Sequence, residues 1–506
     1  MPGLLHFFEA SLPRWLRGQN HPPLKLSSVI IAAAAGVIGL KVLKMIKRMF
    51  ERAPFPGPGM SFVFRLALMS TEDQFKELMV LPRKFGKICC FKTPARQVLV
   101  VSDVPTYRSV MKRRPREFSA PDFENIMDGV NMAMSEGDLW KKHRRISSRP
   151  LTETNLDKLL PMICSTAQNL IRGLRESAGR EGRIVWRPVR DLQLCAARVA
   201  SAVYMGEDNP IISKNPLYTD EMQDEIWSLI SDGFMLTLNP SCVFYHDRFF
   251  YRLVFPGVRE FAQRWRRIES KILDATRRRV RDGLGRPHVC KSLPDSAGRE
   301  FSEEELAHTL IMYLGGGAET TASAMSWLLS NFCLHPEIQQ RARREADSIE
   351  ELSVESIRSM PFIEACALET LRLNPSVPVS INRALVDCEV AGKEVKAGTR
   401  LVLPIGQMMQ ESYEEGQKFM PERWLTPSGD SIDEEKRLEF IAFGFGPRQC
   451  PGRHLAIREL LCNAVLLLRN FDHFRLHDDQ VVSPKFSNPL TTCPKNLVVR
   501  MRCRAP

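Results

Sequence analysis

The residues most suited to chemistry in this sequence lie in one glycine-rich stretch near its C-terminal end. It reads Phe443-Gly-Phe-Gly446-Pro-Arg448-Gln-Cys450-Pro-Gly452. Glycines let a loop fold tightly enough to turn backbone N–H groups toward a buried thiolate. The arginine supplies a permanent positive charge for a neighbouring anion. An apolar helical run follows, and the combination suits haem iron held by an axial thiolate from Cys450.

A second candidate stretch, Gly315-Gly316-Gly-Ala-Glu319-Thr320, lies inside a predicted helix. Each glycine there costs about 1 kcal/mol relative to alanine, so something should offset that cost. Without side chains, the backbone at Gly316 can approach a flat cofactor and open a kink for a small ligand. Glu319 and Thr320 then place a carboxyl and a hydroxyl beside the groove, which suits proton relay. A flexible helix hinge is the alternative interpretation.

Two weaker pairs stand at helical spacing. Trp140 and Arg144 are four residues apart, and both are donors suited to a carboxylate. By itself, this pair is more typical of a surface cation–π contact. Glu369 and Arg372 are three residues apart, and a lone pair of this kind is usually a surface salt bridge.

The elements that must position these residues are mostly helical. Apolar periodicity predicts long helices within 155–205 and 222–283, and Ser302 with Glu305 forms a capping box ahead of a helix to about 334. Runs of β-branched residues predict a hairpin over 88–101 and short strands over 388–402. The fold class is therefore mainly α with a small β region.

Composition narrows the functional class. The chain has 506 residues, 44% of them hydrophobic, and a net charge of +12. This charge suits nucleic acid, an anionic membrane or an acidic protein partner. No zinc-finger spacing or RNA-binding aromatic signature is present, so a nucleic-acid partner is not expected. The 13 cysteines are scattered without a CxxC pair, which indicates a reduced, cytosol-facing chain.

The N-terminal segment 1–52 differs from the rest. Its apolar residues at about 28–48 predict a single membrane-anchor helix, with a cleaved signal, a transit peptide or a surface helix as alternatives. Lysines and arginines follow the apolar run, which places the bulk of the protein in the cytosol. A proline-rich joint at 53–59 then leads into one domain over 53–506.

The stretch around Cys450 matches Phe-x-x-Gly-x-Arg-x-Cys-x-Gly, and the chain thereby resembles the cytochrome P450 family. The resemblance covers about 54–502, with the motifs in family order, and it implies the P450 fold with haem b bound between Cys450 and Gly316. Phe443, Gly446, Arg448 and Gly452 complete the haem-binding loop in that comparison.

The resemblance also implies roles for the other motif residues. Glu319 and Thr320 match the acid and threonine of the oxygen-activating motif. Further matches are haem-propionate contacts at Trp140, Arg144 and Arg383, and a structural network of Glu369, Arg372 and Arg423.

The implied activity is a haem-thiolate monooxygenase that inserts one oxygen atom from O2 into a lipophilic substrate. Its electrons are expected from NADPH-cytochrome P450 reductase, with cytochrome b5 as a second donor. The expected location is the endoplasmic reticulum membrane, with mitochondrial or plastid membranes as alternatives. A haem-thiolate isomerase or dehydratase acting on peroxides and a non-catalytic haem sensor are the rival functions. The substrate itself is not predicted.

Overall fold

The computed structural model describes residues 39, 53–93, 96–120, 132–133, 135–205, 220–238, 256–281, 301–478, 480–486 and 491–505. The chain divides into two units, Met1–Arg52 and Ala53–Pro506. Apart from Gly39, the predicted membrane anchor at about 28–48 lies outside the described residues. Within the described part, no helix is both long and apolar enough to cross a membrane.

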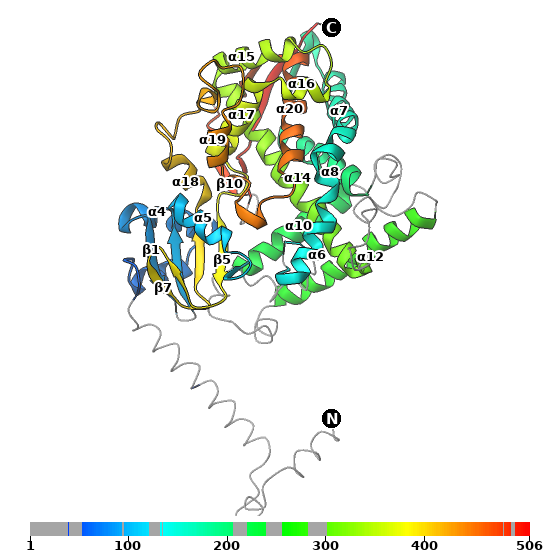
Figure 1. The fold of residues 1–506 in the computed structure, drawn as a ribbon. Coiled ribbons are helices and arrows are strands. Elements are labelled where there is room, and N and C mark those ends of the chain that lie inside the picture. Colours follow the sequence, from blue (N-terminus) through cyan, green and yellow to red (C-terminus); the bar gives the residue numbers. More distant parts are fainter. Residues whose placement is uncertain are drawn as a thin grey trace, which may run out of the picture. The chain divides into compact units, whose positions relative to one another are not determined.

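Helices make up most of the described second unit (Figure 1). The α-helices are α3 (Met60–Ala67), α4 (Thr71–Phe85), α5 (Val104–Lys112), α6 (Gly137–Ser147), α7 (Glu153–Glu176), α8 (Pro188–Met205), α10 (Asp220–Leu238), α12 (Pro256–Arg281), α14 (Glu303–Leu334), α15 (Pro336–Asp347), α16 (Val354–Arg358), α17 (Pro361–Leu373), α18 (Ile405–Glu411), α19 (Glu434–Glu439) and α20 (Arg453–Asn470). Short 3-10 turns are η3 (Arg149–Leu151), η4 (Arg180–Gly182), η6 (Pro421–Trp424) and η7 (Gly446–Arg448).

The strands form four small sheets. The largest has the order β1-β2-β8-β5-β3, and β2 and β8 are its one parallel pair among the described strands. The others are β4-β12-β9, β10-β11 and β6-β7. The bounds are β1 (Ile88–Lys92), β2 (Gln97–Val101), β3 (Phe118–Ser119), β4 (Arg183–Trp186), β5 (Ser380–Ala384), β6 (Cys388–Val390), β7 (Lys393–Val395), β8 (Arg400–Leu403), β9 (Phe471–Leu476), β10 (Pro484–Phe486), β11 (Thr492–Pro494) and β12 (Val499–Cys503). The predicted mainly helical fold with a small β region is confirmed.

Helix α14 runs through the middle of the main apolar core. Its residues are buried along nearly the whole length, and they pack with α8, α17 and α20 in one cluster (Figure 1). The predicted capping box is present: the Ser302 hydroxyl accepts from the Glu305 N–H, and the Glu305 carboxylate accepts from the Ser302 N–H. A buried helix of 32 residues therefore begins at a defined point and carries the glycine stretch into the core.

The prediction of long helices within 155–205 is confirmed by α7 and α8, but the strand between them was not predicted. Strand β4 lies there and pairs antiparallel with β12. Its burial alternates, with Ile184 and Trp186 inside and their neighbours outside, which is the period of a strand. Helix α7 has already ended at Glu176, and Gly182 directly before the strand has φ of +69°, a conformation that glycine adopts without strain. The 222–283 region likewise holds two helices, α10 and α12, with residues 239–255 outside the described part.

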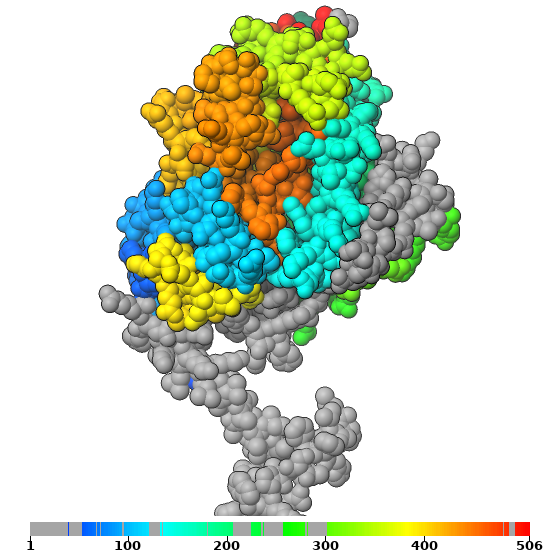
Figure 2. All heavy atoms as spheres, in the orientation of Figure 1, coloured from blue at the N-terminus to red at the C-terminus, as the bar shows by residue number. Residues whose placement is uncertain are grey.

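Segments far apart in the sequence meet around the C-terminal glycine-rich loop. On the face in Figure 2, orange atoms of the C-terminal part are framed by blue and cyan atoms of the N-terminal part. The loop contacts α5, and α20 packs along α7. Residues from α5 and α6 are therefore close enough to share a site with the cysteine.

Candidate active site

The loop around Cys450 is folded back on itself by two glycines. Gly444 and Gly446 have φ of +80° and +72°, which side-chain-bearing residues rarely adopt. A Cβ on Gly446 would also lie 2.8 Å from the carbonyl oxygen of Met111 in α5, so only glycine fits there. The loop closes where the Cys450 N–H donates to the carbonyl of Phe443 at 2.8 Å. This geometry presents the cysteine just before α20.

The surroundings of Cys450 have opposing effects on its thiol. Its side chain is exposed, yet burial by surrounding protein is the largest influence on the thiol and raises its pKa. The Gly452 N–H, Arg144 and Arg453 act in the opposite direction and favour the thiolate. Gly452 is also the N-cap of α20, so the positive end of that helix faces the sulfur. A bound metal cation would complete the deprotonation.

Arg448, two residues ahead, is held by several partners. Its side chain is 5% exposed and ion-pairs with Glu136. It also donates to the carbonyl of Met132 at 3.0 Å, and its guanidinium lies 4.5 Å from the centroid of the Trp140 ring. Burial and the nearby Arg114 lower the pKa of Arg448 to about 10. Arg448 is therefore held in one position, although burial and the neighbouring positive charge disfavour its charged form.

The same region has unused donors and excess positive charge. The Nε–H groups of Arg448 and Arg114 are buried and have no hydrogen-bond partner among the described residues. Arg144 adds a third guanidinium close enough to lower the pKa of Arg448. Glu136 is the carboxylate that faces both Arg448 and Arg114. Because buried donors cost free energy unless paired, this cluster fits the carboxylates of a haem next to Cys450.

The three glycines of α14 serve different neighbours. A Cβ on Gly315 would come within 1.8 Å of the Ile230 side chain in α10, and one on Gly317 would lie 3.4 Å from Ala200 in α8. Gly316 has nothing within 4 Å of such a position, so it faces open space. Close helix packing therefore explains two glycines, and Gly316 is the one that faces open space. Helix α14 is continuous through the glycine stretch, so the predicted kink does not interrupt the helix.

Glu319 and Thr320 lie on different sides of α14. The Thr320 hydroxyl donates to the carbonyl of Gly316 at 2.6 Å, which places it one turn along on the open side. Glu319 is 8% exposed and sits one turn after Gly315, on the side packed against α10. The Thr320 carbonyl accepts from the Ser376 hydroxyl at 2.7 Å. Thr320 thus lies on the open side of α14 with Gly316, whereas the Glu319 carboxyl is on the neighbouring, buried side.

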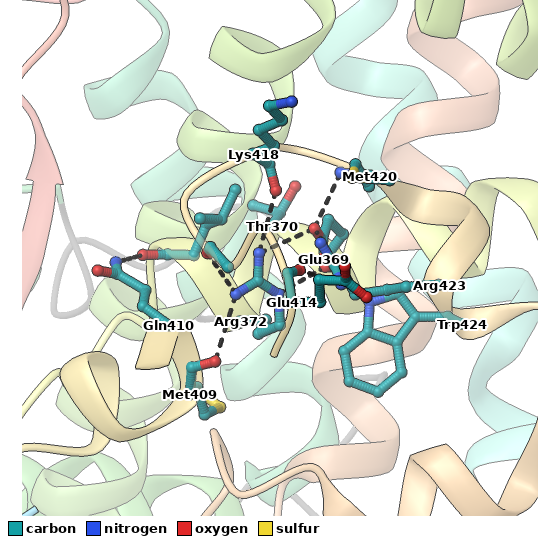
Figure 3. A network of polar contacts seen from close by, with 12 residues as sticks. Glu369, Thr370, Arg372, Met409, Gln410, Glu414, Lys418, Met420, Arg423 and Trp424 are labelled. Carbon is teal, nitrogen blue, oxygen red and sulfur yellow. Dashed lines mark hydrogen bonds and ion pairs between the residues drawn. The ribbon is translucent and has the colours of Figure 1, made fainter. Parts of the chain in front are cut away.

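The structure brings Glu369, Arg372 and Arg423 together (Figure 3). The Glu369 and Arg372 side chains are both fully buried and form two hydrogen bonds of 2.8 and 2.9 Å. Arg423 donates to the same carboxylate at 3.0 Å, and so does the Trp424 indole at 2.9 Å. Arg372 also donates to three backbone carbonyls, those of Met409, Gly416 and Lys418. This is a buried, well-paired network and not a surface salt bridge.

The match to known proteins agrees with this geometry. The family model described as Cytochrome P450 matches residues 54–501. The chain belongs to the cytochrome P450 family.

Individual relatives have low sequence identity to this chain but align with most of its length. This P450 is 25% identical to "Cytochrome P450 2J1" of Oryctolagus cuniculus, over 87% of this chain and 89% of that protein. It is 23% identical to "Cytochrome P450 2J2" of Homo sapiens with the same coverage. Among solved structures, "Retinoic acid bound cyanobacterial CYP120A1" has a TM-score of 0.67 at 22% identity, covering 84% of this chain and 93% of that one. That structure supports the fold, and family membership makes this chain a haem-dependent P450 monooxygenase.

Sequence reasoning did not anticipate three residues of the P450 site. Arg114 and Glu136 complete the charged cluster at Arg448, but each comes from a segment without a motif. Trp424 completes the buried network, and its position directly after Arg423 was an available signal.

The predicted residue Arg383 lies on β5, where its register neighbours are Ser119 and Arg400 of the large sheet.

Proposed function

We propose that this P450 is a membrane-anchored enzyme that inserts one oxygen atom from O2 into a lipophilic organic substrate. Haem b, which the Cys450 thiolate would hold, would supply the oxygen-activating chemistry. The observation that carries the proposal is the pairing of two features in one chain. A cysteine lies at the N-terminus of α20, and a threonine hydroxyl lies on the open side of α14 beside Gly316.

The arginine cluster supports the same cofactor. Arg448 and Arg114 have unused buried N–H groups, and the Arg448 guanidinium lies over the Trp140 ring. These groups would bind and orient the haem carboxylates, with Arg144 adding charge. Arg383 on β5 remains a candidate for the same role.

Thr320 and Glu319 would handle protons. The Thr320 hydroxyl donates to the Gly316 carbonyl, which leaves its oxygen free to accept from an ordered water on the open side. Glu319, held on the neighbouring side of α14, would supply or take up a proton through such water. Each side chain would therefore hold a proton at a defined atom next to the groove.

The proposed redox partners follow from the net charge of the chain, and the proposed location follows from its N-terminal segment. We infer electron delivery from an NADPH-dependent P450 reductase or cytochrome b5 with an acidic docking face, which a chain of net charge +12 favours. The apolar residues at about 28–48 support an anchor in the endoplasmic reticulum membrane with the catalytic domain in the cytosol. Mitochondrial or plastid membranes are the alternatives.

One reconstitution tests the function. The full-length chain with reductase and NADPH should consume O2 and NADPH together once a lipophilic substrate shifts the absorption spectrum. Turnover of an organic peroxide without O2 or reductase would instead identify an isomerase or dehydratase. Haem and gas binding without NADPH consumption across a broad substrate screen would identify a sensor.

A further inference from the structure

His143 on α6 is a fully buried imidazole with a polar partner at each ring nitrogen. Its Nε2 lies 3.0 Å from a carboxylate oxygen of Glu305, at the start of α14. Its Nδ1 lies 3.2 Å from the hydroxyl of Ser135. The ring packs edge-on against Phe301, with the ring centroids 5.3 Å apart. These contacts leave the imidazole one position and one orientation.

The direction of the hydrogen bonds follows from Glu305. Burial raises the pKa of Glu305, but hydrogen bonds from Lys142, the Ser302 N–H and His143 outweigh it and lower the pKa to about 2. An ionised carboxylate only accepts, so Nε2 of His143 carries a hydrogen. In the neutral imidazole, Nδ1 then accepts from the Ser135 hydroxyl. A directed chain therefore runs from Ser135 through His143 to the start of α14.

The same short segment holds Arg448 from its other side. The Ser135 carbonyl accepts from Arg448, and the next residue, Glu136, ion-pairs with the same guanidinium. His143 lies three residues after Trp140, whose ring faces that guanidinium. One buried side chain thus connects the start of α14 to the groups that hold Arg448.

A carboxylate, imidazole and hydroxyl in a row also form the arrangement of a hydrolytic triad. Such a triad needs a hydroxyl that a substrate can reach. Ser135 is 6% exposed and His143 is 0% exposed. The arrangement in this chain is therefore suited to holding structure and not to nucleophilic attack.

We propose that His143 is a positioning residue for the haem-carboxylate site. It ties the N-terminus of α14 to residues 135–136 and so keeps Arg448 and Trp140 in their binding positions. The inference rests on the proposed function, because it requires Arg448 to face a haem carboxylate. It goes further by assigning haem retention to a residue whose ring nitrogens face Ser135 and Glu305.

The test measures how fast the full-length haem-loaded protein releases haem to excess apomyoglobin. His143→Phe keeps an aromatic ring beside Phe301 but removes both hydrogen bonds, and haem release should become roughly tenfold faster. His143→Gln retains a donor and an acceptor and should restore release to within about threefold of the unmodified rate. Lys141→Ala on the same helix, where the exposed lysine pairs with Asp138, should leave the rate unchanged. Unchanged release from His143→Phe overturns the proposal.

A double-mutant cycle separates positioning from general loss of structure. His143→Phe and Arg448→Lys should have non-additive effects on haem release, because both act on residues 135–136. Additive effects overturn the route through Arg448. If His143→Phe does not fold, Ser135→Ala removes only the hydroxyl of the same link and should speed release about fivefold; no change there counts against the proposal. A failure of the proposed function is measured separately: a haem-thiolate isomerase or a haem sensor would still show these differences in haem release but would not consume O2 and NADPH with a substrate.

Discussion

The Thr320 hydroxyl donates a hydrogen bond of 2.6 Å to the carbonyl oxygen of Gly316, one turn earlier on the same face of α14. Gly316 is the member of the glycine stretch that faces open space. Thr320 therefore lies on the open side of α14, while the neighbouring Glu319 lies on the side packed against α10.

Thr320→Ala should uncouple NADPH consumption from product formation. The methyl group leaves no hydroxyl to accept from water in the groove, so proton delivery loses its controlled donor. We expect peroxide released per NADPH consumed to rise severalfold, with substrate binding retained. Thr321→Ala makes the same change on the next, buried residue and should keep normal coupling. Normal coupling in Thr320→Ala would rule out the proton-relay role.

Replacing Gly315 or Gly316 of α14 with alanine should change the free energy of unfolding in opposite directions. In the haem-free protein, Gly316→Ala adds a Cβ with no neighbour within 4 Å, so it should raise the unfolding free energy by up to about 1 kcal/mol. Gly315→Ala drives its Cβ into the Ile230 side chain and should lower that free energy instead. Urea unfolding of the two purified variants measures both. Equal effects would mean that α10 does not pack against Gly315 as described.

Glu369→Ala should destabilise the fold strongly. Arg372 would remain fully buried without its carboxylate, and Arg423 and Trp424 would each lose an acceptor. Removing one partner of a buried pair costs roughly 3–5 kcal/mol. Glu422→Ala, which breaks an exposed pair with Arg341, should cost less than about 1 kcal/mol. Similar melting temperatures for both variants would contradict the buried network.

Glu305 should make the free energy of unfolding depend on pH in the acid range. Its folded pKa of about 2 lies below its ordinary value of 4.5, so the folded state favours the carboxylate. That contribution is fully present above about pH 4.5 and is lost as the pH falls toward 2. Glu305→Gln should flatten the fall in stability over this window. Glu304→Gln, on an exposed neighbour, should leave it in place, and identical pH profiles for the two variants would refute the assignment.

Local patterns predicted much of this site because the residues concerned act close to their own backbone. The loop to Cys450 and the capping box at Ser302 depend on neighbours within a few positions, and the structure has both. The role of Gly315 could not be read, because it depends on Ile230 in a helix far away in sequence.

The sequence also did not predict the charged partners that lie in irregular segments. Glu136 meets Arg448 across more than three hundred residues, and no periodicity marks it. Strand β4 was missed because it has only four residues, too few for its alternation to outweigh the helical pattern around it. Both misses follow from contacts that only the tertiary fold creates.

The most direct test of the central claim is the spectrum of the reduced, carbon-monoxide-treated full-length protein, alone and with Cys450→Ala. The account predicts a thiolate-type absorption band in the unmodified protein that disappears in Cys450→Ala. Cys388→Ser, at a half-buried cysteine on β6, should retain the band. An unmodified chain without haem, or a band that survives the loss of Cys450, would contradict the account.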